Sequence, residues 1–256
     1  MPPRIAYAAD RDIGVWVLDY LLERGCVPLA LLLSGTERAS HAGELEARLP
    51  QPVGGIFRGA EFRAPAALQA LAGLELDYIV GVHFPYLVPP EALRLARTGV
   101  LNLHPALLPY NRGWHTASWA ILDDSPFGAT LHFMDEGVDT GDIVHQRELA
   151  ISPADTADSL YQRVKRLELQ VFREAWPAVE EGTLQRRPQD PRAGSTHRKS
   201  DLARDEIRRI DLEAPTRARD LLRRLRALTT NTPAEGAYVE LDGIRYHVRV
   251  TVQRDN

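Results

Sequence analysis

Apolar runs and amphipathic segments alternate along the first part of the chain. Runs typical of strands buried on both faces of a sheet lie at 4–9, 28–34, 54–58, 77–82 and 100–103. Apolar side chains recur about every 3.6 positions at 15–22 and 65–71, which predicts helices, and a helical turn is expected after Pro89-Pro90. Strands that alternate with helices in this order predict an α/β fold with a mostly parallel, doubly wound sheet flanked by helices.

The pattern changes after Gly113. The elements expected there are a helix at 116–122, extended segments at 128–134 and 143–149, and a long helix at 155–181 with Asp155 or Thr156 as its cap. Residues 186–200 are rich in Pro, Gly and charge, as linkers are. A helix at 214–228 and a β-hairpin around Asp242-Gly243 follow. We therefore expect an N-terminal domain, 1–185, and a small C-terminal α+β module, 186–256, that ends in a β-hairpin.

Composition narrows the class of protein. The 256 residues are 44% hydrophobic and 26% charged, which is ordinary for a globular protein. The one cysteine, Cys26, excludes a disulfide framework and a multi-cysteine metal site, and we expect no metal. The N-terminal segment lacks the layout of a signal peptide, and no apolar run has the length of a membrane span. These features predict a cytoplasmic protein without a membrane partner.

Charge is distributed unevenly along the chain. The net charge is −4, yet residues 186–256 hold 16 Lys or Arg against 11 Asp or Glu, whereas residues 1–185 hold 15 against 24. A basic C-terminal module on an acidic body could attract a phosphate-bearing ligand. A solvated helix face would have the same composition, so charge alone leaves both interpretations open.

Polar side chains interrupt the apolar run at 100–103. Asn102 lies within it and His104 follows, at the carboxyl end of a predicted parallel strand, where open α/β sheets bind ligands. A glycine-rich acidic stretch, DEGVDTGD at 135–142, is expected to turn between two extended segments and could return a carboxylate to this point. An amide, an imidazole and a carboxylate suit acyl transfer, because they supply an oxyanion donor, a proton acceptor and a group that orients it. The alternatives are a structural histidine and a solvated turn.

Two motifs give these residues a family resemblance. NLHPALLPYNRG at 102–113 and GATLHFMDEGVDTGD at 128–142 resemble the signature of the formyltetrahydrofolate-dependent formyltransferases. That family includes the glycinamide ribonucleotide, methionyl-tRNA and sugar N-formyltransferases. The resemblance implies a Rossmann-like formyltransferase fold, with the catalytic domain at 1–185, and an enzyme that transfers a one-carbon group.

The resemblance also implies a catalytic role for Asn102, His104 and Asp139. The formyl donor is then 10-formyltetrahydrofolate and the acceptor is a primary amine, with no metal involved. Asn102 and His104 stabilise the oxyanion that forms when the amine attacks, and such a donor contributes about 3 kcal/mol. His104 takes the proton of the amine, while Asp139 orients and tunes the imidazole, directly or through a water.

The folate in this family lies in a cleft lined largely by main chain. The matching positions here are Phe84, Pro85, Tyr86, Leu87 and Val88 after the fourth predicted strand, and Glu136, Gly137 and Val138 in the acidic turn. The aromatic and aliphatic members also suit an ordinary core. Ala106 stands where many relatives carry serine, which removes one hydroxyl from the expected acceptor contacts.

Two acceptor classes fit this sequence less well than a third. The segment AYAADRDIGVW at 6–16 lacks the glycine- and serine-rich phosphate loop of glycinamide ribonucleotide enzymes. A net charge of −4 with a short basic tail argues against tRNA, since RNA binding needs many phosphate contacts, and we expect no nucleic-acid partner. The resemblance then favours a nucleotide-linked amino dideoxysugar of bacterial surface glycans such as O-antigen, with dTDP-4-amino- or dTDP-3-amino-dideoxyhexoses expected first.

Candidate acceptor-binding residues follow the catalytic loop or lie in the basic tail. They are Tyr110, Asn111, Arg112, Trp114, His115, Arg198, Lys199 and Arg226, the last three for the phosphates. Each is alternatively a surface or a core side chain. A methionyl-tRNA or other small-amine formyltransferase, a formyltetrahydrofolate hydrolase and a non-catalytic folate-binding module remain alternative functions. The apolar, β-branched hairpin at 236–250 is expected to pair with a second copy as a homodimer.

Overall fold

The computed structural model describes residues 2–35 and 40–255, which fall into two compact units. The first unit consists of Met1–His104, Thr130–Gln146 and Glu168–Gln189, and the second of Pro105–Ala129, Arg147–Leu167 and Asp190–Asn256. The chain thus passes between the units several times. The expected division into domains at residues 185 and 186 stays a prediction.

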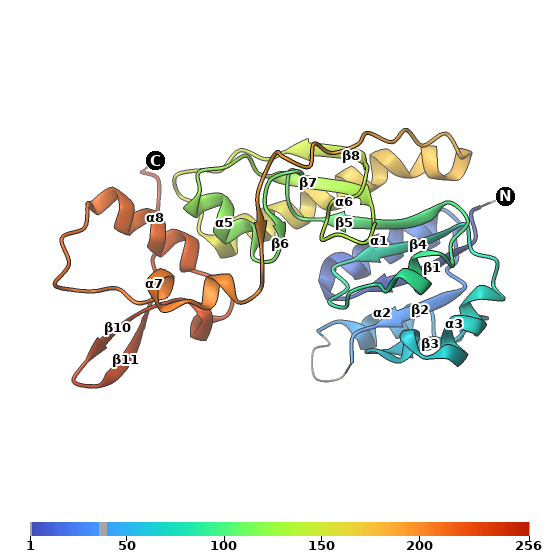
Figure 1. The fold of residues 1–256 in the computed structure, drawn as a ribbon, viewed down its shortest axis with the longest axis horizontal. Coiled ribbons are helices and arrows are strands. Elements are labelled where there is room, and N and C mark those ends of the chain that lie inside the picture. The colour runs from blue at the N-terminus through green and yellow to red at the C-terminus, as the bar shows by residue number, and fades with distance from the viewer. Residues whose placement is uncertain (1, 36–39, 256) are drawn as a thin grey trace. The chain divides into compact units, whose positions relative to one another are not determined.

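A seven-stranded sheet, counted over the described residues, is the frame of the first unit (Figure 1). Its strands, in spatial order, are β3 (Ile56–Arg58), β2 (Ala30–Leu33), β1 (Ile5–Ala9), β4 (Tyr78–Val82), β5 (Gly99–His104), β7 (Gly128–Phe133) and β8 (Ile143–Glu148). Neighbours from β3 to β5 pair in parallel, whereas β5 and β7 pair antiparallel. The predicted α/β fold with a mostly parallel sheet is therefore confirmed.

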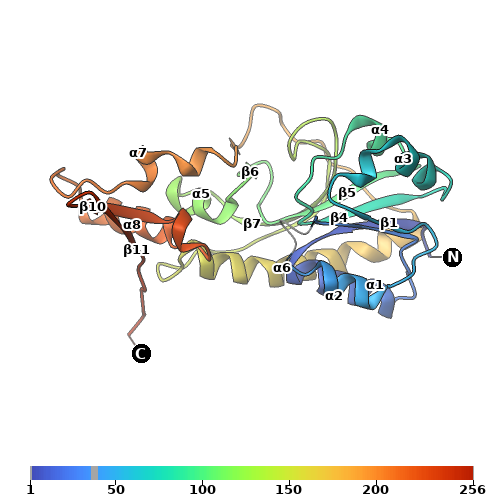
Figure 2. The ribbon, with the colours of Figure 1, turned by 90° about the horizontal axis from the view of Figure 1, so that it is seen from below.

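Helices cover both faces of this sheet. The helical segments are α1 (Arg11–Glu23), α2 (Ala42–Arg48), η1 (Glu61–Arg63), α3 (Pro65–Ala72), α4 (Pro90–Leu93) and residues 168–181 of α6 (Ala157–Glu181). Figure 2 shows α1 and α2 on one face and α3 and α4 on the other. The short helix α2 was not predicted from the apolar pattern, because only Ala42 and Leu45 of its seven residues are buried.

Successive side chains of β1 point to opposite faces of the sheet, and both faces are apolar, so each face must be covered by helices. Ala6 and Ala8 pack into a core cluster that includes Leu71 of α3. Tyr7 lies between them in the chain and donates its hydroxyl to the carbonyl oxygen of Gly14 in α1 at 2.6 Å. Because β1 is buried on both faces, it forms a continuous apolar run, as parallel strands do.

The second unit contains short elements. They are β6 (Arg112–Gly113), α5 (Thr116–Leu122), residues 157–167 of α6, β9 (Thr196–His197), η2 (Asp201–Ala203), α7 (Asp205–Arg208), α8 (Ala218–Leu228), η3 (Pro233–Glu235), β10 (Ala237–Leu241) and β11 (Ile244–Val248). β10 and β11 form the predicted antiparallel hairpin. Asp242 and Gly243 both have positive φ, 51° and 76°, as a two-residue hairpin turn requires.

Two local details bear on the predictions for this unit. Thr156 caps α6, since its Oγ1 accepts from the Ser159 amide while the Ser159 hydroxyl accepts from the Thr156 amide. The expected linker 186–200 is not merely a connection, because Thr196 and His197 in it pair with β6. A two-residue strand is too short to leave a periodic signal in the sequence.

Within the described ranges, no helix combines the length and apolar character that crossing a bilayer requires.

Candidate active site

β5 carries Asn102 and His104 to the carboxyl end of the parallel strands. Asn102 pairs in register with Gly81 of β4 on one side and with His132 of β7 on the other. A Cβ at Gly81 would lie 3.2 Å from the Asn102 side-chain oxygen, so a larger residue in β4 would press on this amide. The strand order therefore places one asparagine and two histidines, Asn102, His104 and His132, close together at the carboxyl end of the parallel strands.

The loop 134–142 between β7 and β8 returns Asp139 to this edge. Its turn is closed from within by Asp135, whose Oδ1 accepts from the Gly137 amide at 2.9 Å and from the Thr140 hydroxyl at 2.6 Å. Gly141 is required, because a Cβ there would lie 2.0 Å from the carbonyl oxygen of Phe133. The predicted turn in DEGVDTGD is thus present, and it holds a carboxylate against β5.

Four side chains meet at this point. The Asn102 amide nitrogen lies 3.3 Å from Asp139 Oδ1 and 3.2 Å from His132 Nε2. Asp139 Oδ2 lies 3.6 Å from His104 Nε2, and Asp139 Oδ1 lies 3.5 Å from His132 Nε2. His132 Nδ1 is 2.7 Å from the carbonyl oxygen of Phe133, to which it must donate. This bond assigns the proton to Nδ1 and leaves Nε2 able to accept from Asn102.

The cluster is nearly closed to solvent. His132 is fully buried, His104 is 6% exposed and the Asp139 side chain is 15% exposed. Electrostatic interactions are stronger in such a water-poor setting than at a surface. The arrangement offers an amide donor, an imidazole for proton transfer and a carboxylate that can stabilise positive charge on that imidazole. No set of three or more His, Cys, Asp or Glu side chains among the described residues has an arrangement suited to a metal ion.

His132 lies in the motif at 128–142, but the sequence pattern does not indicate it as a site residue. A histidine in an apolar strand reads as a core residue, and here it is indeed fully buried. Its contact with Asn102 follows from the antiparallel register of β5 and β7, in which the two residues are direct partners. Only knowledge of that register could have added it to the site.

The predicted folate-binding segment 84–88 follows β4, the parallel neighbour of β5. Phe84, Tyr86 and Val88 pack against the core cluster, and the Tyr86 hydroxyl accepts from the Gly35 amide at 3.0 Å. Leu87 differs from them, since 76% of it is exposed. Pro85 lies between these residues and is half-buried. The segment thus offers its backbone and Leu87, rather than the Phe84 and Tyr86 rings, to a ligand.

The other predicted folate contacts, Glu136, Gly137 and Val138, form the exposed tip of the loop 134–142. Val138 is 44% exposed. It immediately precedes Asp139, so the loop has an exposed apolar side chain next in sequence to this carboxylate. A flat, partly apolar ligand could lie against such a surface.

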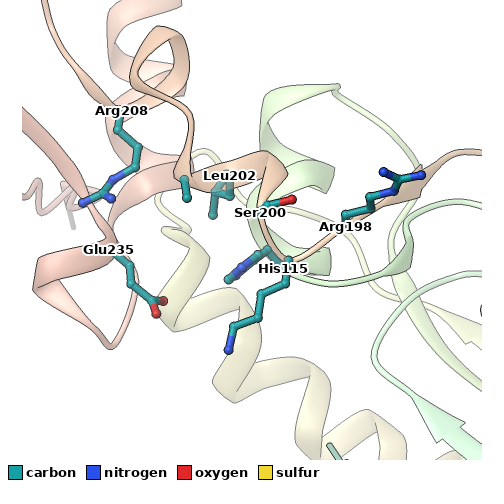
Figure 3. Close-up of a pocket in the computed structure, with 8 residues that line it drawn as sticks. His115, Arg198, Ser200, Leu202, Arg208 and Glu235 are labelled. Carbon is teal, nitrogen blue, oxygen red and sulfur yellow. The ribbon is translucent and has the colours of Figure 1, made fainter. Parts of the chain in front are cut away.

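Three of the predicted acceptor-binding residues line one cavity of the second unit. His115, Arg198 and Lys199 border a cavity of about 560 Å³. Figure 3 shows Arg208 and Glu235 on the side opposite His115, with the Arg198 guanidinium directed away from Glu235. Sequence reasoning missed Arg208 and Glu235, since neither belongs to a motif. Burial lowers the pKa of His115 below its ordinary value of 6.5.

The other predicted acceptor-binding residues lie outside that lining. Asn111 and Arg112 are buried, and their side chains donate to Ser125 Oγ at 2.9 Å and to the Ala193 carbonyl oxygen at 3.3 Å. Tyr110 and Trp114 are 37% and 39% exposed, and the Lys199 ammonium lies 5.2 Å from the centre of the Trp114 ring.

Arg226 is engaged with the backbone. Its guanidinium donates to the carbonyl oxygens of Asp155 and Ser152, both at 2.7 Å, and burial lowers its pKa. These contacts hold the turn before α6. A role of Arg226 at a phosphate stays a prediction.

His197 makes the second unit sensitive to acid. Its ring stacks on Trp119 with centroids 4.0 Å apart and planes 5° apart. Burial lowers the pKa of His197 below its ordinary value of 6.5, and Asp123 at 3.6 Å only partly opposes this. The unfolded chain therefore binds this proton more tightly than the folded chain does. The free energy of unfolding should fall as the pH drops below about 6.5.

His197→Phe keeps a ring against Trp119 but cannot titrate. We expect its loss of stability between about pH 8 and about pH 5.5 to be smaller than that of the wild type in urea unfolding. His115 titrates in both proteins and cancels in the comparison. Equal losses in the two proteins would contradict the assigned role of His197.

Comparisons with known proteins identify the family of the chain. The model of the formyl transferase family matches residues 33–176, and that of the N-formyltransferase dimerization C-terminal domain matches residues 203–254. A methionyl-tRNA formyltransferase of Parvibaculum lavamentivorans is 31% identical over 98% of this chain and 80% of its own. A dTDP-4-amino-4,6-dideoxyglucose formyltransferase of Mycobacterium bovis is 33% identical over 69% of this chain and 74% of its own.

Solved structures share the fold at lower identity. A sugar N-formyltransferase from a Shewanella species aligns over 99% of both chains with a TM-score of 0.83 and 21% identity. An N-formyltransferase from Helicobacter canadensis, solved with folinic acid and dTDP-3-aminofucose, aligns over 94% of this chain and 85% of its own, with a TM-score of 0.71 and 18% identity. The formyl transferase family model matches more than half of the length of this chain. The chain therefore belongs to the formyl transferase family and is a formyltransferase.

Proposed function

We propose that the chain transfers the formyl group of 10-formyltetrahydrofolate to the primary amine of a nucleotide-linked amino sugar. One observation carries the chemistry: the Asp139 carboxylate lies 3.3 Å from the Asn102 amide nitrogen and 3.6 Å from His104 Nε2, in a nearly closed site. Formyl transfer to an amine needs a donor to an oxyanion and an acceptor for a proton, and these side chains supply both.

Each catalytic side chain has a distinct role in this proposal. In the structure, the two protons of the Asn102 amide are directed at Asp139 Oδ1 and His132 Nε2. In the reaction one of them turns to the oxygen that gains negative charge as the amine attacks, a contribution of about 3 kcal/mol. His104 accepts the proton that the attacking nitrogen loses. N10 of the folate gains a proton as its bond to the formyl carbon breaks, and tetrahydrofolate leaves. Asp139 orients the imidazole and stabilises the positive charge that it gains. The buried hydrogen bond from His132 Nδ1 to the Phe133 carbonyl oxygen fixes the orientation of the imidazole ring that the Asn102 amide contacts.

The formyl donor is proposed to lie along the segment 84–88 and the tip of the loop 134–142. The exposed apolar side chains of Leu87 and Val138 suit the flat, partly apolar body of a folate, while the backbone around them offers polar groups. Both segments are close in the fold to catalytic residues, since 84–88 follows β4, which pairs with β5, and the loop itself contains Asp139. The Helicobacter relative was solved with folinic acid, which supports a folate as the formyl donor.

Two observations support an amino sugar as the acceptor. The cavity of the second unit is lined by three cations, Arg198, Lys199 and Arg208, against one acid, Glu235, and this excess of positive charge suits a diphosphate. The Shewanella sugar N-formyltransferase matches the whole chain in length and fold. We further infer that the nucleotide is dTDP, because the Mycobacterium relative is a dTDP-4-amino-4,6-dideoxyglucose formyltransferase and the Helicobacter relative was solved with dTDP-3-aminofucose.

A second candidate function is formylation of methionyl-tRNA. One specific observation favours it: the Parvibaculum relative is 31% identical over 98% of the chain, nearly the identity of the dTDP-sugar relative over a longer stretch. The net charge of −4 weighs against it, because RNA binding relies on many phosphate contacts.

An acceptor panel distinguishes these functions. Release of tetrahydrofolate from 10-formyltetrahydrofolate would be followed with dTDP-, UDP- and GDP-linked amino sugars, with methionyl-tRNA and with no amine. We expect release to depend on one class of dTDP-amino sugar. Release with methionyl-tRNA alone would establish the second candidate, and release without any amine would identify a hydrolase. Asp139→Asn is the control for contaminating activity.

We also propose that the chain is a homodimer joined through the hairpin of β10 and β11. Ile244 and Tyr246 on β11 are 55% and 49% exposed, and Leu241 on β10 is 49% exposed, which is unusual for large apolar side chains on one short hairpin. They lie in the segment matched by the dimerization domain model. A second copy of the same hairpin would cover them in a two-fold arrangement.

Ile244→Glu tests the dimer. A buried, unpaired charge at a two-fold interface should raise the dimer dissociation constant by about 100-fold or more. Val53→Glu is the matched control, because Val53 is an apolar residue of the first unit that is 88% exposed. Sedimentation at micromolar concentration should give a dimer for the wild type and Val53→Glu, and a monomer for Ile244→Glu. A monomeric wild type would contradict the proposal.

A further inference from the structure

Gln189 binds the backbone of the loop that carries Asp139. Its side-chain amide nitrogen donates to the carbonyl oxygen of Asp139 at 2.9 Å and to that of Gly141 at 2.7 Å. One amide group thus bridges two carbonyls that are two residues apart in the loop 134–142. The sequence placed Gln189 in the expected linker 186–200 and assigned it no role.

The position of Gln189 is set by a short backbone pairing. The Ile143 amide donates to the Arg187 carbonyl oxygen at 2.8 Å, and the Arg187 amide donates to the Ile143 carbonyl oxygen at 2.9 Å. This bridge fixes the segment beside the first residue of β8. Gln189 follows two residues later and therefore reaches the loop that ends at β8.

The loop needs support at this place. Asp139 has a φ of 54°, a left-handed conformation that residues other than glycine adopt rarely and that persists only when the surroundings hold it. Asp135 closes the loop from within, through the Gly137 amide and the Thr140 hydroxyl. Gln189 holds the loop from outside, at the carbonyl oxygens of Asp139 and Gly141.

We propose that Gln189 is a positioning residue that sets the backbone conformation of Asp139 and thereby the direction of its carboxylate. The inference rests on the proposed catalytic role of Asp139. Because the Gln189 amide bonds to backbone carbonyl oxygens of the loop, we assign it an action through the loop and not on the substrate. A displacement of a catalytic group by about 1 Å can cost 100-fold in rate.

Gln189→Met tests this role with little change of volume, because methionine keeps the length of the side chain and removes both donors. We expect kcat to fall by about 10- to 100-fold, with the KM of each substrate changed by less than about threefold. Gln185→Met is the matched control, since Gln185 lies on the same segment and donates to the Thr183 carbonyl oxygen instead. The control should keep wild-type kcat and KM.

Gln189→Glu gives a second, independent readout. An ionised carboxylate cannot donate to the two carbonyls, whereas a protonated carboxyl group regains one donor. The ratio of its kcat to that of the wild type should therefore rise as the pH is lowered. A side chain that only supported folding would lower the thermal midpoint without this pH-dependent ratio. Gln189→Glu also decides the question if Gln189→Met proves unstable.

The outcomes separate this inference from the proposed function. If Asp139→Asn is inactive while Gln189→Met and Gln189→Glu keep kcat within twofold of the wild type, the positioning role is wrong and the catalytic site stands. If Asp139→Asn itself keeps wild-type kcat, the proposed catalytic site fails and the role of Gln189 fails with it. A lowered kcat in both Gln189 variants, with unchanged KM and an unaffected Gln185→Met, supports the inference.

Discussion

Asp139→Asn is expected to lower kcat by about 1,000-fold while leaving folate binding within about threefold of the wild type. Asparagine has the shape of aspartate, so the loop 134–142 should keep its conformation. The variant loses the charge that stabilises the His104 imidazole when it takes a proton from the amine. It also turns an acceptor of the Asn102 amide proton, 3.3 Å away, into a mixed donor and acceptor.

Asp142→Asn is the matched control for this result. Asp142 is a half-buried acid of the same loop, and its backbone oxygen rather than its carboxylate contacts β7, by accepting from Phe133. Steady-state rates and titration with 5-formyltetrahydrofolate separate catalysis from folate binding. If Asp139→Asn kept near-wild-type turnover, the carboxylate would have no part in the chemistry.

His104→Ala is expected to abolish measurable transfer, with a loss in kcat of about 1,000-fold or more. His104 Nε2 lies 3.6 Å from the Asp139 carboxylate, and His132 Nε2 lies 3.5 Å from it. His132 cannot replace it easily, since its Nδ1 is bonded to the Phe133 backbone and its Nε2 faces Asn102.

Two further measurements complete the test of His104. His145→Ala is the control, because His145 is a partly exposed histidine of the same sheet that pairs with Glu174. It should keep wild-type turnover. Folate binding to His104→Ala should persist, since the proposed folate contacts lie in other segments. Turnover of His104→Ala within tenfold of the wild type would mean that another group accepts the proton.

Much of the first unit could be predicted from the sequence, because its strands are buried on both faces. Residues 30–33 and 78–82 form continuous apolar runs, and Asn102 and His104 stand out against such a run at its carboxyl end. The motif resemblance added Asp139, which lies in a turn that the glycines of 135–142 had already indicated. The structure brings these three residues together at one edge of the sheet.

Other parts left no signal in the sequence. The contact of His132 with Asn102 depends on an antiparallel register between strands that are separated by the whole 105–127 segment. Gln189 lies in a segment whose composition is that of a linker, and its role follows from one backbone bridge at Arg187. Asn111 and Arg112 belong to a polar loop sequence that suggests ligand binding, yet both are buried and hydrogen-bonded within the second unit. A single sequence does not distinguish such embedded polar residues from exposed ones.

The most direct test of the proposed function follows the fate of the formyl carbon. The enzyme would be incubated with 10-formyltetrahydrofolate labelled with ¹³C in the formyl group, together with a dTDP-linked amino sugar and methionyl-tRNA in one mixture. We predict that the label appears as a formamide on the sugar amine, that methionyl-tRNA stays unlabelled and that Asp139→Asn transfers none. Label found in formylmethionyl-tRNA or in free formate, with none on the sugar, would contradict the proposed function.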